Sequence, residues 1–138
     1  MAVLFDVEVS LALGADLTAD PSTWSWTDIT DYVLTNDQSR YITITRGRSD
    51  WQSTAYPSTC RMFLDNRDGR FTRLNPTGAY YGQLTKNTPI RVRACATGGT
   101  LVTRYIGYVS EWPPRWDPSE NHKWVEIRAD GILRRLSQ

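Results

Sequence analysis

The sequence predicts an all-β fold: a single partly open β-barrel or sandwich of seven or eight short antiparallel strands, with a short C-terminal helix. Apolar and polar residues alternate in several short stretches, and turn-forming residues separate these stretches at intervals of about 8 to 15 residues. The 138 residues, 40% hydrophobic and 22% charged, have the composition of one globular domain. We expect residues 1–138 to form a single β-barrel domain, either complete or the N-terminal part of a longer chain.

In the first half of the chain, a strand is predicted over residues 5–13, where apolar side chains occupy every second position. Residues 14–23 form a polar loop. The aromatic residues 24–33 predict a short, irregular strand, and residues 41–48 another strand, with Gly47 at its end or in a bulge.

The stretch around which the rest is arranged runs from Cys60 to Leu84. Cys60, Met62 and Leu64 alternate with polar or outward positions, which is typical of a strand with one buried face. Residues 65–69 favour a turn, so residues 70–72 are expected to pair backward as a hairpin. We interpret this stretch as a rigid, polar-tipped element that carries aromatic side chains, suited to docking.

In the second half, strands are predicted over residues 88–96, 101–112 and 124–129, with a turn at residues 97–100. A helical turn is expected near residues 80–84. Helical spacing of Ile132, Leu133 and Leu136 predicts the C-terminal helix.

Charge is distributed unevenly along the chain. Residues 1–37 contain seven acidic residues and no Lys or Arg, whereas residues 38–138 contain all 16 bases and eight acids. In one interpretation both segments pack together in a monomer; in the other, the acidic segment of one copy meets the basic surface of its neighbour in a ring. Fourteen of the 16 bases are Arg, which favours interfaces.

The two cysteines, Cys60 and Cys95, are predicted to be free thiols. Strand parity places Cys60 on the side of Met62 and Leu64, and Cys95 on the side of Arg91 and Arg93. The two thiols therefore face different ways.

Catalytic and ligand-binding motifs are not recognised. The single histidine, His122, lies in a polar stretch typical of a hairpin tip. Asp65 and Asp68 have the wrong spacing for a calcium loop and suit turn formation. We expect no enzyme activity, no cofactor, no metal, no membrane span and no specific nucleic-acid binding.

Residues 112–118, WPPRWDP, have the most unusual local composition. Three prolines stiffen this stretch, so Trp112 and Trp116 are either presented on a rigid loop or cap the end of the barrel core. In the first interpretation the loop contacts a neighbouring protein or a sugar ring.

An ordered set of motifs extends over nearly the whole chain. It comprises WTDITDYV at residues 26–33, ITRGR at 44–48, LDNRDGRFT at 64–72, Asn75-Pro76, Tyr80-Tyr81, NTPIRVR at 87–93, Gly107 and GILRRL at 131–136. This set resembles the N-terminal domain of minor tail proteins from phages of actinobacteria, which look related to the β-barrel modules of tail-tip and baseplate hubs.

The resemblance implies a structural virion component of a phage tail tip, or of a related contractile injection machine, made in the host cytoplasm. Its partners would be copies of itself in a symmetric ring and neighbouring tail proteins. The candidate interface residues are Trp112, Pro113, Pro114, Arg115, Trp116, Asp65, Arg67, Asp68, Tyr80 and Tyr81. The alternative is a carbohydrate-binding β-sandwich, which would present an exposed planar row of tryptophans to a sugar.

Overall fold

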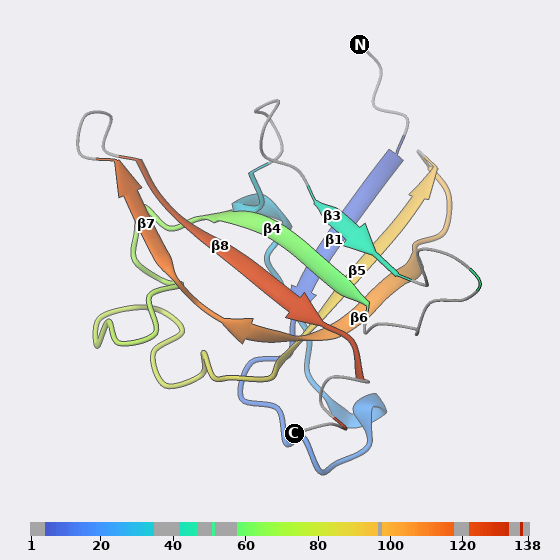
Figure 1. Ribbon diagram of the computed structural model, residues 1–138, viewed down its shortest axis with the longest axis horizontal. Coiled ribbons are helices and arrows are strands. Elements are labelled where there is room, and N and C mark those ends of the chain that lie inside the picture. The colour runs from blue at the N-terminus through green and yellow to red at the C-terminus, as the bar shows by residue number, and fades with distance from the viewer. Residues whose placement is uncertain are drawn as a thin grey trace.

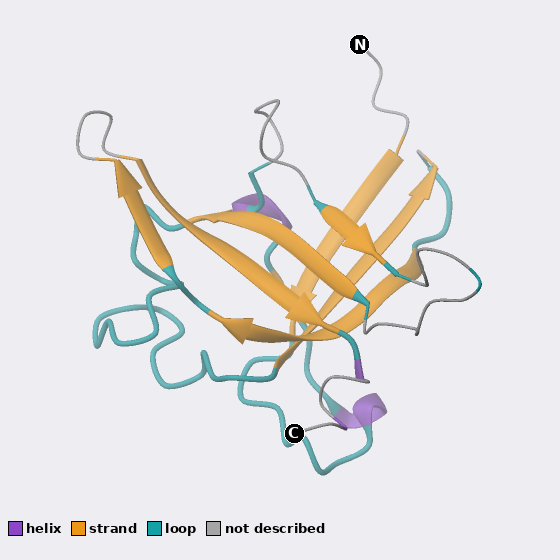
Figure 2. Ribbon diagram, viewed as in Figure 1, coloured by secondary structure: helices purple, strands orange, loops and turns teal. Residues whose placement is uncertain are grey.

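The computed structural model describes residues 5–34, 42–46, 51, 58–96, 98–117, 122–132 and 136; at residues 5, 114–117 and 122 it describes the backbone. Its strands form one antiparallel sheet (Figure 1), so the all-β prediction is confirmed. The strands are β1 (Phe5–Leu11), β2 (Thr27–Asp28), β3 (Thr43–Thr45), β4 (Thr59–Asp65), β5 (Thr88–Ala96), β6 (Val102–Glu111), β7 (Pro114–Asp117) and β8 (His122–Asp130). Figure 2 shows long loops between strands and only small helical pieces, among them the 3-10 helices η1 (Pro21–Thr23) and η2 (Thr30–Tyr32). Within the described part, no helix is long and apolar enough to cross a membrane.

The strand order is β2-β1-β5-β6-β8-β4-β3, with β7 also paired to β8. Both β6 and β7 pair with β8: β6 contacts its C-terminal end and β7 its N-terminal end. The path does not close into a barrel. The segment after η2 contacts β4: the Leu34 N–H donates to the Phe63 carbonyl at 2.9 Å, and Val33 forms a bridge with Leu64.

Alternation in the sequence determines which side chains form the core. Along β4, Cys60, Met62 and Leu64 are buried, and their cross-strand partners on β8 are buried with them. Val9 and Leu11 of β1, a strand near the other end of the sheet, are buried in the same core. The predicted inward face is confirmed for β4, and for β1 at Val9 and Leu11, as expected for strands with one buried face, whereas Val7 of β1 is 41% exposed.

A second, smaller apolar cluster lies beside the main core. Trp24 packs edge-on against Tyr108 at 6.3 Å and against Trp26 at 6.1 Å between ring centroids. The Trp24 Nε1–H donates to the Asp16 carbonyl at 2.9 Å, which satisfies the polar atom of this buried indole. The polar loop after β1 is therefore held against the sheet.

Several local predictions need correction. Residues 24–33 contain only two strand residues and then η2, and the described part of residues 41–48 is a strand only at β3. No helical turn forms near residues 80–84, where successive turns occur instead. The expected C-terminal helix falls largely on residues 133–135 and 137–138, outside the described residues.

Both cysteines are free, as predicted, and both are buried. Cys60 is 1% exposed in the core, and its burial raises the pKa of the thiol to about 12. Burial disfavours the charged thiolate, so Cys60 is a structural side chain rather than a nucleophile.

Candidate docking surface

Residues 66–87 connect β4 to β5 and form a chain of turns, which we call the turn segment. Five N–H groups spaced three residues apart each donate to the carbonyl three residues earlier, at 3.0 to 3.2 Å: those of Gly69, Thr72, Asn75, Gly78 and Tyr81. Asn and Gly recur at the junctions because they accept the backbone angles of tight turns. The predicted return strand at residues 70–72 is therefore wrong.

Asn66 fixes the start of the turn segment. Its side chain is 3% exposed, and its Oδ1 accepts a hydrogen bond from the Phe71 N–H at 2.9 Å. Its Nδ2 donates to the Thr72 hydroxyl, also at 2.9 Å. The side chain thus occupies the backbone donor that a returning strand would have used for pairing, which is the physical reason that no hairpin forms.

Phe71 anchors the turn segment in the core. It is fully buried, stacked on Trp112 with a centroid distance of 6.3 Å and an interplanar angle of 5°, and flanked by Tyr32 and Tyr80. The Trp112 Nε1–H donates to the Thr85 carbonyl at 3.1 Å, at the far end of the same segment. Trp112 thereby joins both halves of the turn segment to the sheet.

Gly69 and Asn75 are tied together in the middle of the segment. Gly69 has a φ of +76°, which favours glycine, and a Cβ there would lie 2.6 Å from Asn75 Nδ2. Asn75 Nδ2 donates to the Gly69 carbonyl at 3.1 Å. This close approach keeps the loop compact.

Two ion pairs lie at the tip beside β4. Arg67 binds both carboxylate oxygens of Asp65, with Nη2–Oδ2 at 2.8 Å, and Arg70 Nε lies 2.6 Å from Asp68 Oδ2. The hydrogen bond to Asp65 and its charge raise the pKa of Arg67. The Arg70 guanidinium also lies 4.1 Å from the centroid of the Tyr32 ring.

A cavity of about 450 Å³ opens between these charges and Tyr32. It is lined by Tyr32, Asp65, Arg67 and Asp68. Since Arg67 is exposed and both signs of charge are present, the cavity suits a polar protein surface better than an apolar ligand.

The structure divides the predicted interface residues into three groups. Asp65, Arg67 and Asp68 line one cavity, and Tyr80 is linked to this group through Arg70, which pairs with Asp68 and lies 5.5 Å from the centroid of the Tyr80 ring. Tyr81 is exposed in the same turn segment. Trp112 is only 7% exposed, so for this indole the core-capping interpretation is correct. Pro113 is partly buried, and the side chains of Pro114, Arg115 and Trp116 in β7 lie outside the described residues.

The prediction of a rigid loop at residues 112–118 missed β7. Its backbone pairs antiparallel with β8 from Pro114–Val125 to Asp117–His122. Proline lacks an N–H and usually argues against a strand, which concealed β7, but a strand with one free side tolerates it.

Sequence reasoning also missed Arg70, Tyr32 and Leu74. Leu74 is 83% exposed although it lies in a segment ordered by hydrogen bonds on both sides of it. The signal available for Leu74 was an apolar residue within a polar, turn-forming stretch. Arg70 and Tyr32 meet only through the fold.

No arrangement for catalysis or metal binding emerges from the described residues. Among them, no three His, Cys, Asp or Glu side chains are grouped to hold a metal ion. The carboxylates at the tip are occupied by arginines, which keeps them from acting as a free acid and base pair.

The tryptophans do not form an exposed planar row in the described part of the chain. Trp24 and Trp112 are buried. Trp26 is partly buried, and the Arg91 guanidinium lies over its ring, with Cζ 4.5 Å from the ring centroid. Trp51 is 82% exposed. The geometry expected for the carbohydrate-binding alternative is therefore not seen among these side chains.

The uneven charge is neutralised only in part within one copy. Glu8 of β1 forms ion pairs with Arg93 and, at 3.9 Å, with Arg91 of the neighbouring strand β5. Burial, followed by the charge of Arg93, lowers the pKa of Arg91. Glu8 in the first strand thus follows the monomer interpretation. The aspartates of the loops after it form no ion pair with a residue that the structure describes; the pKa of Asp28 is lowered mainly by hydrogen bonds from Thr30 and also by the charge of Arg93.

No protein-family model matches the chain, and no curated protein matches it either.

Proposed function

We propose that this chain is a structural component of a phage tail tip or baseplate hub, or of a related contractile injection machine. It acts by docking to copies of itself and to neighbouring tail proteins in a symmetric ring, and not by catalysis.

The observation that carries the proposal is the turn segment. Three of the motifs that resemble minor tail proteins, namely LDNRDGRFT, Asn75-Pro76 and Tyr80-Tyr81, belong to this one ordered element and its junction with β4. The element exposes Leu74, 83%, and Tyr81, 55%, and carries the charged tip at its start. An ordered segment with exposed apolar side chains and a polar surround has the composition of a protein interface.

The open, all-β sheet with one main core agrees with what the resemblance implies about the fold. A preorganised segment also loses little conformational entropy when it binds, because its backbone is already fixed by turns. This favours a docking role for the turn segment over a role as a flexible linker.

The direct experiment is immunogold labelling of the virion encoded by the same genome, with an antibody raised against the purified chain. Gold at the tail tip is the expected result. Labelling of the capsid alone, or a chain encoded outside any phage or injection-system gene cluster, would overturn the proposal.

A second experiment tests the turn segment as the docking element. Particles are assembled with a Leu74→Asp chain supplied in place of the natural one, and with Arg73→Asp as the matched control, since both residues are exposed neighbours. Leu74→Asp is expected to remove the chain from purified tails, while Arg73→Asp retains it. Equal incorporation of both variants would contradict docking through Leu74.

A further inference from the structure

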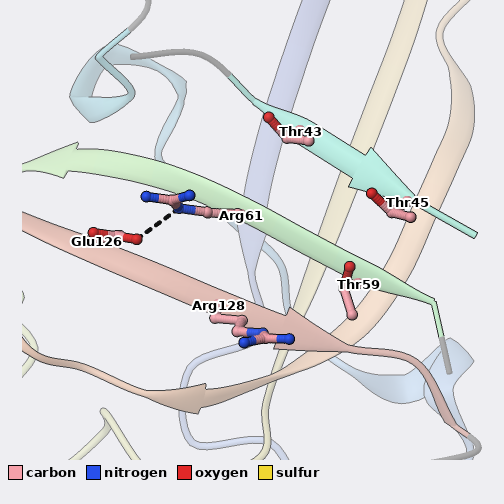
Figure 3. Close-up of a pocket in the computed structure, with 6 residues that line it drawn as sticks. All are labelled: Thr43, Thr45, Thr59, Arg61, Glu126 and Arg128. Atoms are coloured by element: carbon pink, nitrogen blue, oxygen red, sulfur yellow. Dashed lines mark ion pairs between the residues drawn. The ribbon is translucent and has the colours of Figure 1, made fainter. Parts of the chain in front are cut away.

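The outward face of β3, β4 and β8 carries a hollow that none of the predicted interface residues line. We call it the arginine–threonine groove; its volume is about 390 Å³, and it is lined by Thr43, Thr45, Thr59, Arg61, Glu126 and Arg128 (Figure 3). These side chains project from three neighbouring strands of the same sheet, so the groove has a rigid floor.

Two arginines lie on neighbouring strands of this floor. Arg61 of β4 and Arg128 of β8 are direct cross-strand partners, an arrangement that is unfavourable for like charges. Glu126 compensates one of them, because its Oε1 lies 2.6 Å from Arg61 Nε. Arg128 is exposed and forms no ion pair with any residue that the structure describes.

The groups around Arg128 are suited to a carboxylate. A guanidinium offers a planar fork of N–H donors that matches the two oxygens of a carboxylate. In Figure 3 the Arg128 guanidinium lies on the side of Thr59, whose hydroxyl is a further donor, and Thr45 is the cross-strand partner of Thr59. One compensated and one uncompensated arginine leave the lining side chains with a net charge of +1.

The chain itself contains a matching acidic segment. Asp16, Asp20, Asp28 and Asp31 are exposed, and no Lys or Arg occurs among residues 1–37. None of these four aspartates forms an ion pair with a described residue, and none lines the groove. Hydrogen bonds from Thr18, Ser22 and Thr30 lower the pKa of Asp16, Asp20 and Asp28 respectively, so these carboxylates stay charged in mild acid.

We propose that the arginine–threonine groove of one copy binds the acidic segment, Asp16 to Asp31, of a second copy. The contact joins two different surfaces, so it is heterologous and builds a ring when the rotation closes. This inference rests on the proposed function, in which copies assemble, and names the surfaces that meet. Charge complementarity selects the partner, and Arg128 supplies the central contact.

The test is the mass of the chain in solution, measured by light scattering over a range of concentrations at low and high salt. The natural chain is expected to form a discrete oligomer that dissociates as salt rises, because screening weakens exposed ion pairs. The variant Arg128→Glu is expected to lower the association constant by about tenfold or more. Arg73→Glu makes the same charge change on an exposed arginine of the turn segment and is the matched control.

A mixing experiment separates a specific contact from a general charge effect. Asp31→Arg reverses one acidic residue that accepts no hydrogen bond from another described residue. Arg128→Glu alone and Asp31→Arg alone should each remain dissociated, since each places like charges in contact. Mixed in equal amounts they should assemble, because the groove of each variant then meets the opposite charge on the other.

The possible results are distinct. Oligomers of the natural chain that persist in Arg128→Glu, or a mixture that stays monomeric, would overturn the groove contact while leaving the tail-tip proposal to the labelling experiment. A monomer at every concentration and salt would also overturn the groove contact. Binding of the groove to an anionic sugar polymer, without self-association, would replace the second copy as its occupant.

Discussion

Strand β4 and the turn segment are consecutive in the chain, yet they are held in different ways. β4 is paired along its whole length with β8 and at its start with β3, so backbone hydrogen bonds to other strands define its place. From Gly69 to Gln83 the backbone hydrogen bonds of the turn segment are local, and side chains such as Asn66 and Asn75 add further bonds. Only at its two ends do backbone N–H groups, those of Asn66 and Asn87, donate to carbonyls of distant residues, Lys123 and Val109. Only Phe71 among its first turns is fixed in the core.

This difference predicts where each region tolerates change. A strand in a ladder keeps its backbone bonds whatever its outward side chains are, so its outward face is free to carry function, as in the arginine–threonine groove. In a chain of turns, the side chains are themselves the structural bonds. Exposed polar positions should therefore be tolerant in β4, and buried polar positions sensitive in the turn segment.

The largest expected effect comes from removing the anchor of the turn segment. Phe71→Ala should lower the free energy of unfolding by about 3–5 kcal/mol, because it leaves a cavity beside Trp112. Leu74→Ala, at an exposed position in the same segment, should change it by no more than about 0.5 kcal/mol. Urea unfolding followed by tryptophan fluorescence measures both, and similar losses for the two variants would show that Phe71 is not the anchor.

A smaller loss is expected when the side-chain bonds at the start of the segment are removed. Asn66→Ala leaves the buried Phe71 N–H without its acceptor, which should cost about 2–3 kcal/mol. Arg61→Ala in β4 removes a partly exposed ion pair with Glu126 and should cost less than about 1 kcal/mol. If Arg61→Ala proved as damaging as Asn66→Ala in urea unfolding, the contrast between the two regions would fail.

Crowding within the turn segment is tested by two glycines with similar backbone angles. Gly82→Ala, with φ of +79° and open space around it, should cost about 1 kcal/mol for the left-handed conformation alone. Gly69→Ala should cost about 1–2 kcal/mol more, since its Cβ would displace Asn75 Nδ2 from the Gly69 carbonyl. Equal thermal and urea stabilities of the two variants would mean that Asn75 moves aside without loss.

The pH dependence of stability tests the burial of Cys60 in β4. Burial raises the pKa of Cys60 from 9.0 to about 12, so the folded state holds a proton that the unfolded state releases above pH 9. The stability contributed by the neutral thiol is complete below pH 9 and declines as pH rises toward 12, by about 1 kcal/mol per pH unit. Burial also raises the pKa of Tyr105, which acts in the same direction. Urea unfolding at pH 8 to 10.5 should give a shallower decline for Cys60→Ala than for the natural chain; identical slopes would contradict this cause.

What the sequence determined by itself was the position of the longer strands and most of their inward faces. A period of two is a local property, so β1, β4, β5 and β8 and most of the core were readable from residues such as Met62 and Val92. The unpaired state of the two thiols followed from the same parity. The candidate docking residues Asp65, Arg67 and Asp68 were also found, because turn-forming residues cluster there in the sequence.

Only the tertiary structure decided which distant side chains meet. Trp112 was ambiguous in the sequence and became a core residue because Phe71 lies against it. The predicted hairpin is replaced by turns because the Asn66 side chain accepts the hydrogen bond from the Phe71 N–H that a returning strand would use for pairing. Arg61 and Arg128 lie side by side because β4 and β8 are paired in one register, and no local pattern records that register. Contacts between segments depend on packing of the whole chain, and for this reason the arginine–threonine groove was not visible in the sequence.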